Sequence, residues 1–343
     1  MGASRIRVGS VATALPGPPI DNATLGRTLG ASSVFEQWVD QFIGTRTRHL
    51  SVDLETGEAC FTLADLAETA GRKALNDAGV APADVDLVVM GTSMPDALLP
   101  TTVNVVADRL GIDGIRTYQL QSGCTGAMQA LDLAHQLLLS GRHGIALVIG
   151  GDVCAKHVDL GSDLGKLPPS ELVNTVLFGD GAGAAVLTAE DVPGTAVLHR
   201  VLVRLAGRGR APGQIVEWFG MGDRTEERTA LHEDFKAIEE HVPALSEQAL
   251  AELLDDQGWQ SADIDYLLPP QLSVRMTDRI VRHLGLPRAE EVSCVGETGN
   301  TANALPFFQL ERVLPRMEPG DRAVAVAVES SKWIKSGLVL EMI

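Results

Sequence analysis

One cysteine of this chain lies where it could act as a nucleophile. Cys124 stands in the run Gln121-Ser122-Gly123-Cys124-Thr125-Gly126, after a short strand predicted over residues 117–120 and before an amphipathic helical pattern that includes Leu131–Leu139. The helix dipole at such a position favours the thiolate, which is the form that attacks carbonyl groups. The flanking glycines permit a tight turn and a close approach of substrate. The alternative interpretation is a small buried core cysteine, a common environment for this residue.

The composition is typical of a globular α/β protein. Of its 343 residues, 45% are hydrophobic, 21% are charged and 35 are glycine. A net charge of −17 argues against general nucleic-acid binding. The sequence has neither an apolar run of membrane-spanning length nor a signal peptide, so we predict a cytoplasmic protein without membrane association. Its four widely spaced cysteines include no CxxC pair, which argues against a metal site and a disulfide framework.

The elements that must position Cys124 alternate between strands and helices. In the first half we predict strands at 6–14, 85–91 and 145–151 and helices at 61–78 and 100–110. In the second half we predict helices at 245–257, 277–284 and 303–314 and strands at 264–270 and 323–329. The continuous apolar strand at 145–151 is typical of a sheet covered on both faces.

A short internal match points to duplication of this pattern. Gly79–Leu87 and Gly258–Tyr266 align without a gap as G-(V/W)-x-x-A-D-(V/I)-D-(L/Y). Each copy follows a predicted helix and leads into an apolar strand. A repeated α/β unit predicts two related halves, which we place at residues 1–190, with the nucleophile, and 191–343.

Four segments, in order, resemble motifs of the β-ketoacyl-ACP synthase III family. They are Gln37-Trp38 with Gly44–His49, Phe178–Leu187, Asp265–Met276 and Gly299–Ala304. The resemblance runs from about residue 5 to the C-terminus. It implies the thiolase-like α/β fold, in which two similar halves, each a sheet between helices, form a five-layered α-β-α-β-α core. It also implies a homodimer.

The resemblance assigns roles to individual residues. Cys124 falls on the acyl-accepting nucleophile, and its backbone N–H on an oxyanion-hole donor. Asn300 falls on the side chain that polarises a thioester carbonyl or stabilises an enolate. Trp38, Phe42 and Ser273 fall in the binding region for the thiol carrier, where Phe42 replaces an arginine that contacts CoA and Ser273 replaces an asparagine.

Other family residues are missing. Pro270 stands at the position of the family histidine, and a proline can neither donate a hydrogen bond nor move a proton. The loss of one such donor typically costs a factor on the order of 10²–10³ in rate. The usual glycine-rich tail here reads Glu329–Trp333. Three residues are candidates for a replacement base, although a structural role is more common for each: His199, Glu297 and His157.

These departures disfavour ordinary decarboxylative condensation. Our leading hypothesis is an acyltransferase of secondary metabolism, in which Cys124 accepts an acyl group and passes it to the amine or hydroxyl of a small molecule. The donor would be a thioester of an acyl carrier protein or of CoA, with Phe42 favouring the carrier protein, and no cofactor would be permanently bound. The alternatives are a carbon–carbon bond-forming enzyme with a non-standard base and a non-catalytic partner subunit. Retention of Cys124 and Asn300 disfavours the partner subunit.

Overall fold

The computed structural model describes residues 5–31, 34–157, 169–217 and 231–343. Ten of its strands form one mixed sheet that divides into two groups of five. The first group, from the edge inward, is β5 (Arg116–Gln121), β4 (Leu87–Thr92), β6 (Ile145–Asp152), β7 (Gly181–Thr188) and β1 (Ile6–Ala14). The second group continues with β8 (Ala196–Leu205), β14 (Ile334–Met342), β13 (Arg322–Glu329), β11 (Tyr266–Leu268) and β12 (Glu290–Glu291).

The two groups have the same internal topology. In the first, β4 pairs in parallel with β5 and β6, and β7 runs antiparallel to its neighbours. In the second, β11 pairs in parallel with β12 and β13, and β14 runs antiparallel to its neighbours. The groups meet at β1 and β8, which pair antiparallel. Gly79 and Gly258 of the sequence repeat end equivalent helices with φ values of 66° and 67°, so the repeated segment does mark a duplicated structural unit.

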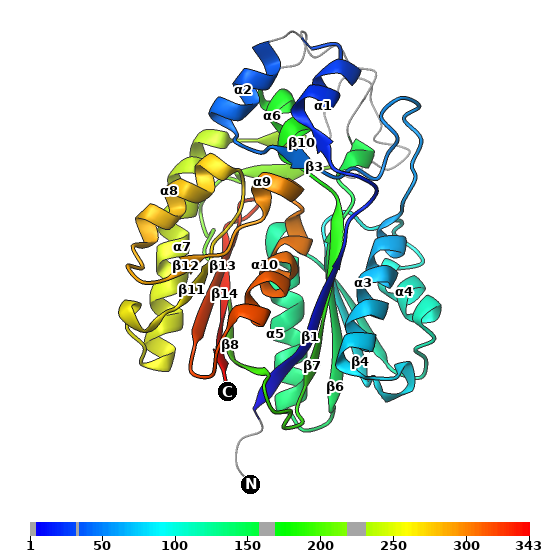
Figure 1. Ribbon diagram of the computed structural model, residues 1–343, viewed down its shortest axis with the longest axis vertical. Helices are drawn as coiled ribbons and strands as arrows, with labels where there is room; N and C mark the ends of the chain where they lie inside the picture. The colour runs from blue at the N-terminus through cyan, green and yellow to red at the C-terminus, as the bar shows by residue number, and fades with distance from the viewer. Residues whose placement is uncertain (1–4, 32–33, 158–168, 218–230) are drawn as a thin grey trace.

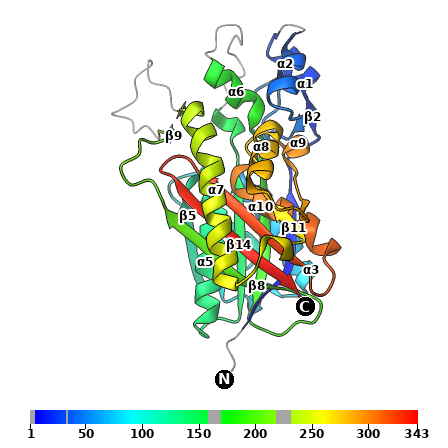
Figure 2. The same ribbon diagram turned by 90° about the vertical axis from the view of Figure 1, so that its left-hand side faces the viewer.

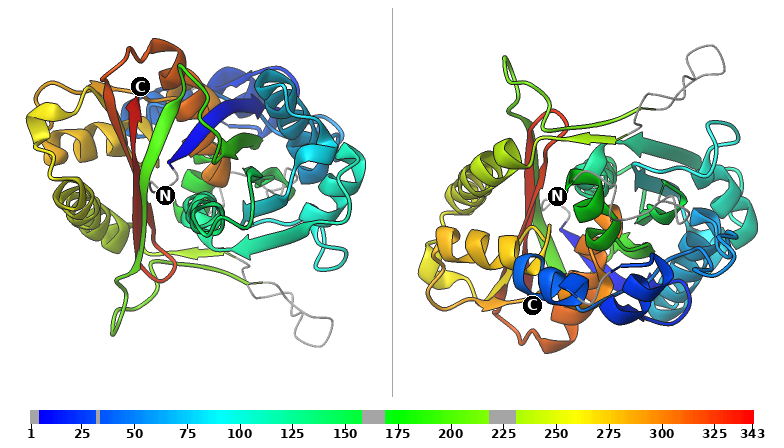
Figure 3. Two further views of the ribbon diagram at one scale, coloured as in Figure 1. Left: turned by 90° about the horizontal axis from the view of Figure 1, so that it is seen from below. Right: turned by 90° about the horizontal axis from the view of Figure 1, so that it is seen from above.

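Six helices complete a five-layered core (Figures 1, 2 and 3). They are α3 (Leu63–Ala78), α4 (Thr102–Leu110), α5 (Gly126–Leu139), α7 (Phe235–Gln257), α8 (Val274–Leu284) and α10 (Leu305–Val313). The first two cover the outer face of the first strand group, and α7 and α8 cover the outer face of the second. The central layer is α5 and α10, which bury Leu131 and Phe307 between the two groups. Every strand group is thus covered on both faces, as the apolar strands predicted.

A smaller layer covers one end of the core, uppermost in Figure 1. It contains α1 (Asn22–Thr28), α2 (Val34–Phe42), α6 (Pro169–Leu177), α9 (Val295–Thr298) and the short ribbons β2 (Ile20–Asp21) with β3 (Thr47–Arg48) and β9 (Gln214–Val216) with β10 (Leu231–Glu233). Phe35, Val39 and Val176 form its apolar centre. This layer brings α2, α6 and β10 over the end of the sheet near Cys124.

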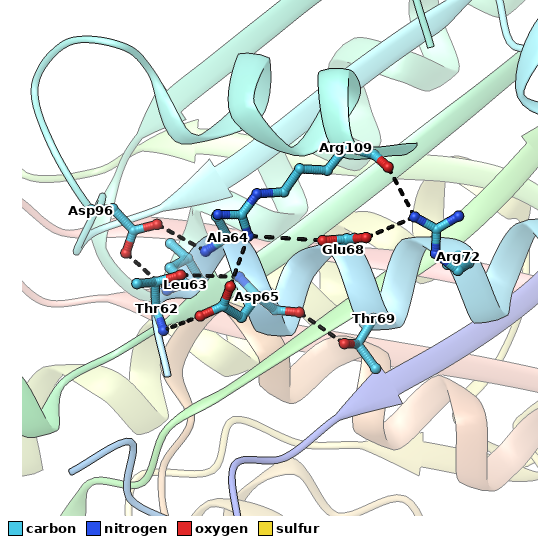
Figure 4. A network of polar contacts seen from close by, with 9 residues as sticks. All are labelled: Thr62, Leu63, Ala64, Asp65, Glu68, Thr69, Arg72, Asp96 and Arg109. Atoms are coloured by element: carbon cyan, nitrogen blue, oxygen red, sulfur yellow. Dashed lines mark hydrogen bonds and ion pairs between the residues drawn. The ribbon is translucent and has the colours of Figure 1, made fainter. Parts of the chain in front are cut away.

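Polar contacts fix the outer helices of the first half (Figure 4). At the start of α3, Thr62 and Asp65 exchange hydrogen bonds in a capping box, with Asp65 accepting from the Thr62 N–H at 2.7 Å. Asp96, from the loop after β4, accepts from the next two backbone N–H groups of α3, each at 2.8 Å. Arg109 of α4 pairs with Asp65 at 2.7 Å. Caps of this kind contribute about 1 kcal/mol each, and they tie α3 to α4 and to the loop after β4.

Helix α7 and strand β14 are among the elements that differ from the sequence prediction. Helix α7 begins at Phe235 rather than at residue 245, where the Asp234 carboxylate caps it by accepting from the Ala237 N–H at 3.0 Å. Pro243 lies inside this helix. Strand β14 was not predicted, although it is almost wholly buried between β8 and β13. Within the described part of the chain, no helix combines the length and apolarity needed to cross a membrane.

Candidate active site

Cys124 and Asn300 line one cavity of about 450 Å³ between the core and the smaller layer, a size typical of small-molecule sites. Its walls come from both halves of the chain. Side chains of α2, α6 and α7 contribute mostly apolar surface, including Trp38, Leu177 and Ile238. Cys124 and Asn300 are 176 positions apart in the sequence. They meet at one site because the two halves pack together.

The turn that carries Cys124 is held from the second half. Cys124 lies in a short 3₁₀ turn, Gly123–Thr125, between β5 and α5. Asn303 accepts from the Ala127 N–H in the first turn of α5 at 2.8 Å, and its side-chain amide donates to Asp152 at 2.7 Å. Asp152 is fully buried at the end of β6. This network fixes the helix N-terminus relative to the sheet.

The expected stabilisation of a thiolate is wrong for this structure. Burial, followed by the negative charges of Glu329, Asp152 and Glu233, raises the pKa of the Cys124 thiol well above its ordinary value. The helix N-terminus favours an anion, but burial, together with carboxyl groups that are distant in sequence, outweighs this effect on the thiol pKa. Cys124 is therefore a neutral thiol at rest and needs a proton acceptor to attack a carbonyl.

The expected oxyanion donor is also occupied. The backbone N–H of Cys124 donates to the carboxylate of Glu329, the last residue of β13. The other Glu329 oxygen accepts from the Ser331 N–H at 2.6 Å. Glu329 is fully buried. The replacement of the family's glycine-rich tail thus brings a carboxylate to the nucleophile.

Asn300 is oriented for donation into the cavity. Its Oδ1 accepts from the Ala302 N–H at 3.0 Å, which identifies the Nδ2 group as the end of the amide that is left to donate. Its backbone is held by Leu177 and Gly179, through bonds of 2.9 Å and 3.1 Å. The Phe178–Leu187 motif therefore serves as a support for Asn300 and as strand β7.

The residues predicted to bind the thiol carrier share the cavity with Cys124. Trp38 and Phe42 from α2 and Ser273 at the start of α8 all line it, as does Pro270. Phe42 is 59% exposed and lies beside Trp38 with ring centroids 6.5 Å apart. Ser273 caps α8 by accepting from the Met276 N–H at 3.2 Å. Their role in binding stays a prediction.

Two of the three candidate replacement bases lie away from Cys124, and the third cannot be placed. His199, on β8, hydrogen-bonds to Glu341 at 3.1 Å and packs edge-on against Trp259. Glu297 pairs with Arg312 at 2.7 Å on the surface. Neither lines the cavity. Histidines and acids at these positions have structural partners instead, and the side chain of His157 lies outside the described residues.

Sequence reasoning missed an acid that does line the cavity. Glu233, on β10, accepts from the Gln214 side chain, while among the residues the structure describes its Oε2 has no hydrogen-bond partner. Burial raises the pKa of Glu233 to about 7, only partly offset by the amides of Asn174 and Gln214. An acid with this pKa is suited to proton transfer near neutral pH. The only sequence signal was its place in an acidic stretch between residues 226 and 240.

The described residues contain no cluster of three or more histidine, cysteine or acidic side chains that could hold a metal ion. Residues 218–230 lie outside the described residues.

Comparison with known proteins identifies the family. Residues 118–204 match the 3-oxoacyl-[acyl-carrier-protein] synthase III model, residues 254–331 match its C-terminal model, and residues 43–159 match the thiolase N-terminal domain. The β-ketoacyl-[acyl-carrier-protein] synthase III of Rhizorhabdus wittichii is 31% identical over 92% of this chain and 93% of its own.

Two solved structures extend the comparison. The tetronic acid condensing enzyme AbyA1 is 60% identical, with a TM-score of 0.95, and the match covers 98% of this chain and 99% of that one. A 3-oxoacyl-(acyl carrier protein) synthase III from Pseudomonas aeruginosa PAO1 is 26% identical, with a TM-score of 0.83 over 98% of each chain. The predicted thiolase-like fold is confirmed, and the chain belongs to the β-ketoacyl-[acyl-carrier-protein] synthase III family of acyl-transferring and condensing enzymes.

Proposed function

We propose that this protein condenses two acyl thioesters to form a tetronic acid. The observation that carries the proposal is its 60% identity, over 98% of the chain, to the tetronic acid condensing enzyme AbyA1. A tetronic acid is a five-membered enol lactone, so building it from two acyl units requires one carbon–carbon bond and one ester bond. The proposal therefore joins two chemistries that the sequence left as alternatives, condensation and acyl transfer to a hydroxyl.

The ring chemistry defines the two substrates. Cys124 takes a 2-hydroxyacyl group from its thioester and releases the first thiol. The carbon between the two carbonyls of a 3-oxoacyl thioester then attacks the acyl group and frees Cys124. Finally, the 2-hydroxyl attacks the remaining thioester carbonyl, which closes the lactone and releases the second thiol. The donors would be thioesters of a carrier protein or of CoA, bound along Trp38, Phe42 and Ser273.

The absence of the family histidine fits this chemistry. A carbon flanked by a ketone and a thioester becomes nucleophilic by losing a proton, without loss of CO₂. Such a substrate needs a base rather than the paired donors that stabilise a decarboxylation enolate. Pro270 therefore does not exclude condensation.

Glu233 is the group best suited to be that base. It lines the cavity with Cys124, its Oε2 is unpaired among the described residues, and its pKa of about 7 leaves much of it ionised at neutral pH. Asn300 would donate through Nδ2 to the oxygen of the carbonyl that develops negative charge, a contact worth several kcal/mol in comparable sites.

The test offers the purified protein a 2-hydroxyacyl and a 3-oxoacyl thioester, on pantetheine analogues and on carrier protein, and follows products by mass spectrometry. We expect a tetronic acid and two thiols for each turnover, with no product from Cys124→Ala. A donor without the 2-hydroxyl should give an open-chain condensed thioester. Formation of simple esters or amides of added alcohols or amines, without a carbon–carbon product, would overturn the proposal in favour of plain acyl transfer.

A further inference from the structure

We infer that Glu329 is the catalytic proton acceptor of Cys124, so that a cysteine–glutamate pair replaces the nucleophile–histidine arrangement. The inference rests on the proposed loading of Cys124 but not on the later ring-forming steps. It concerns a residue 205 positions from Cys124 in sequence, in a tail where the family has glycines.

Glu329 contacts the turn that carries Cys124. The Glu329 carboxylate accepts the backbone N–H of Cys124, and its proximity to the Cys124 thiol is one of the causes that raise the pKa of that thiol. The N–H of Ser331, at 2.6 Å, holds its other oxygen. Ser330 and Val328, on either side in sequence, line the cavity, whereas the carboxylate is turned toward the nucleophile turn. A proton can therefore pass directly from Sγ to Glu329.

The turn that carries Cys124 has the space that the Glu329 carboxylate needs. A Cβ atom at Gly123 would overlap the Glu329 carboxyl group, and Gly123 also has a positive φ of 35°. Glycine at this position thus makes room for an acid that is fully buried. Among the described residues Glu329 forms no salt bridge, and buried carboxylates that lack a cationic partner are costly and concentrate at functional sites.

The Cys124 thiol needs a base, because its surroundings raise its pKa. Acidic groups surround Cys124 from three elements, namely Glu329 on β13, Asp152 on β6 and Glu233 on β10, and Cys154 lies close by. Asp152 is fully occupied by Thr92, Asn303 and backbone donors, which leaves Glu329 as the carboxylate bonded to the residue that carries the thiol.

In the loading step, the Sγ–carbon bond forms while the carbonyl π electrons move to oxygen, and the thiol proton passes to Glu329. Neutralisation of Glu329 removes the negative charge beside the new oxyanion and releases the Cys124 N–H to bind it. When the tetrahedral adduct collapses, the bond to the donor sulfur breaks and the proton of Glu329 passes to that leaving thiolate.

The test measures single-turnover acylation of Cys124 by an acyl-pantetheine thioester, by intact mass, in a Cys60→Ser background because Cys60 is an exposed thiol. We expect Glu329→Gln to slow acylation by about 10²-fold or more at pH 7, as loss of a general base does. In the same variant, the pH dependence of Cys124 alkylation by iodoacetamide should move to lower pH, because a negative neighbour is gone.

Slower acylation together with alkylation at lower pH would distinguish a catalytic role of Glu329 from a purely structural one. Glu329→Asp should recover part of the acylation rate, and Glu341→Gln, a half-buried acid of β14 remote from the cavity, should acylate as the wild type does. Equal acylation in Glu329→Gln and wild type, or faster acylation in the variant, would overturn the inference. Should Glu329→Gln not fold, the Glu329→Asp rate and the wild-type pH profile decide it. A wild type that is never acylated would instead refute the proposed function.

Discussion

At the scale of single residues, the site combines a protonated thiol with two acids of different accessibility. Glu329 is buried against Cys124, whereas Glu233 faces the cavity with one free oxygen among the described residues. Asn300 is held by its neighbours so that its amide donates. We therefore assign thiol activation and carbon-acid activation to different carboxylates.

Glu233 gives a prediction with a defined pH window. Because the base must be ionised, the condensation rate of the wild type should rise as the pH increases through about 7. Glu233→Gln should lower the rate of ring formation by roughly 10²–10⁴-fold and abolish that rise. Steady-state kinetics between pH 5.5 and 8.5, with the exposed Glu247→Gln as the control, would check this. An unchanged profile in Glu233→Gln would exclude Glu233 as the base.

The same pKa has a consequence for stability. Since the folded-state pKa of Glu233 is raised from 4.5 to about 7, the native protein binds more protons than the unfolded chain in this range. This group therefore makes the protein less stable as the pH rises from about 4.5 through 7, by an amount on the order of 3 kcal/mol at most. Urea unfolding should show a smaller decrease in Glu233→Gln. An identical pH dependence would mean that burial of the charge costs little.

Asn300 provides a further test at this scale. Replacing it with alanine should lower the turnover rate by about 10²–10³-fold, as removal of one oxyanion donor does. Burst loading of Cys124 and ring formation can be measured separately by mass spectrometry, which would show whether Asn300 acts in the first step, the second or both. Full activity of the variant would contradict its role as the side-chain donor.

At the scale of elements, we expect the geometry of the turn between β5 and α5 to control whether Cys124 can accept an acyl group. Gly123→Ala places a methyl group against Glu329, whereas Gly141→Ala, just after the other end of α5, adds a methyl to open space. Both glycines have positive φ values, 35° and 72°, so both substitutions add backbone strain of about 1–2 kcal/mol. Only Gly123→Ala should also lose acyl loading. Comparable loading rates in the two variants would mean that the turn tolerates displacement of Glu329.

At the scale of the whole molecule, Asn303 links the two halves. It belongs to the second half but bonds the first turn of α5 and Asp152 of the first half. Asn303→Ala removes one side-chain donor from the buried Asp152 and the acceptor of the Ala127 N–H, and should lower the free energy of unfolding by about 2–4 kcal/mol. Urea denaturation followed by circular dichroism should show one transition at a lower midpoint, while the exposed Asn76→Ala leaves it unchanged. Two separate transitions would show that the halves fold independently. Association into a homodimer remains a prediction.

The fold family and the loss of the family histidine are evident from the sequence alone, which also predicted Cys124 as the nucleophile. Those inferences depend on local signals: apolar periodicity, turn glycines around Cys124, a short repeat and motifs such as Gly299–Ala304. The repeat at Gly79 and Gly258 also located equivalent points in the two halves, because a helix end with positive φ leaves a local mark in sequence.

The protonation state of the site was decided only by the tertiary structure. The sequence predicted a thiolate from the nearest helix, but the pKa of a buried group depends on every charge within a few ångströms. Glu329 reaches Cys124 because β13 ends beside the nucleophile turn, and Glu233 reaches the cavity from the short ribbon β10. Neither neighbour follows from sequence spacing, and for the same reason the sequence could not show that the candidate bases His199 and Glu297 do not line the cavity. The packing of distant segments determines which charged groups surround Cys124, and these groups influence the pKa of its thiol.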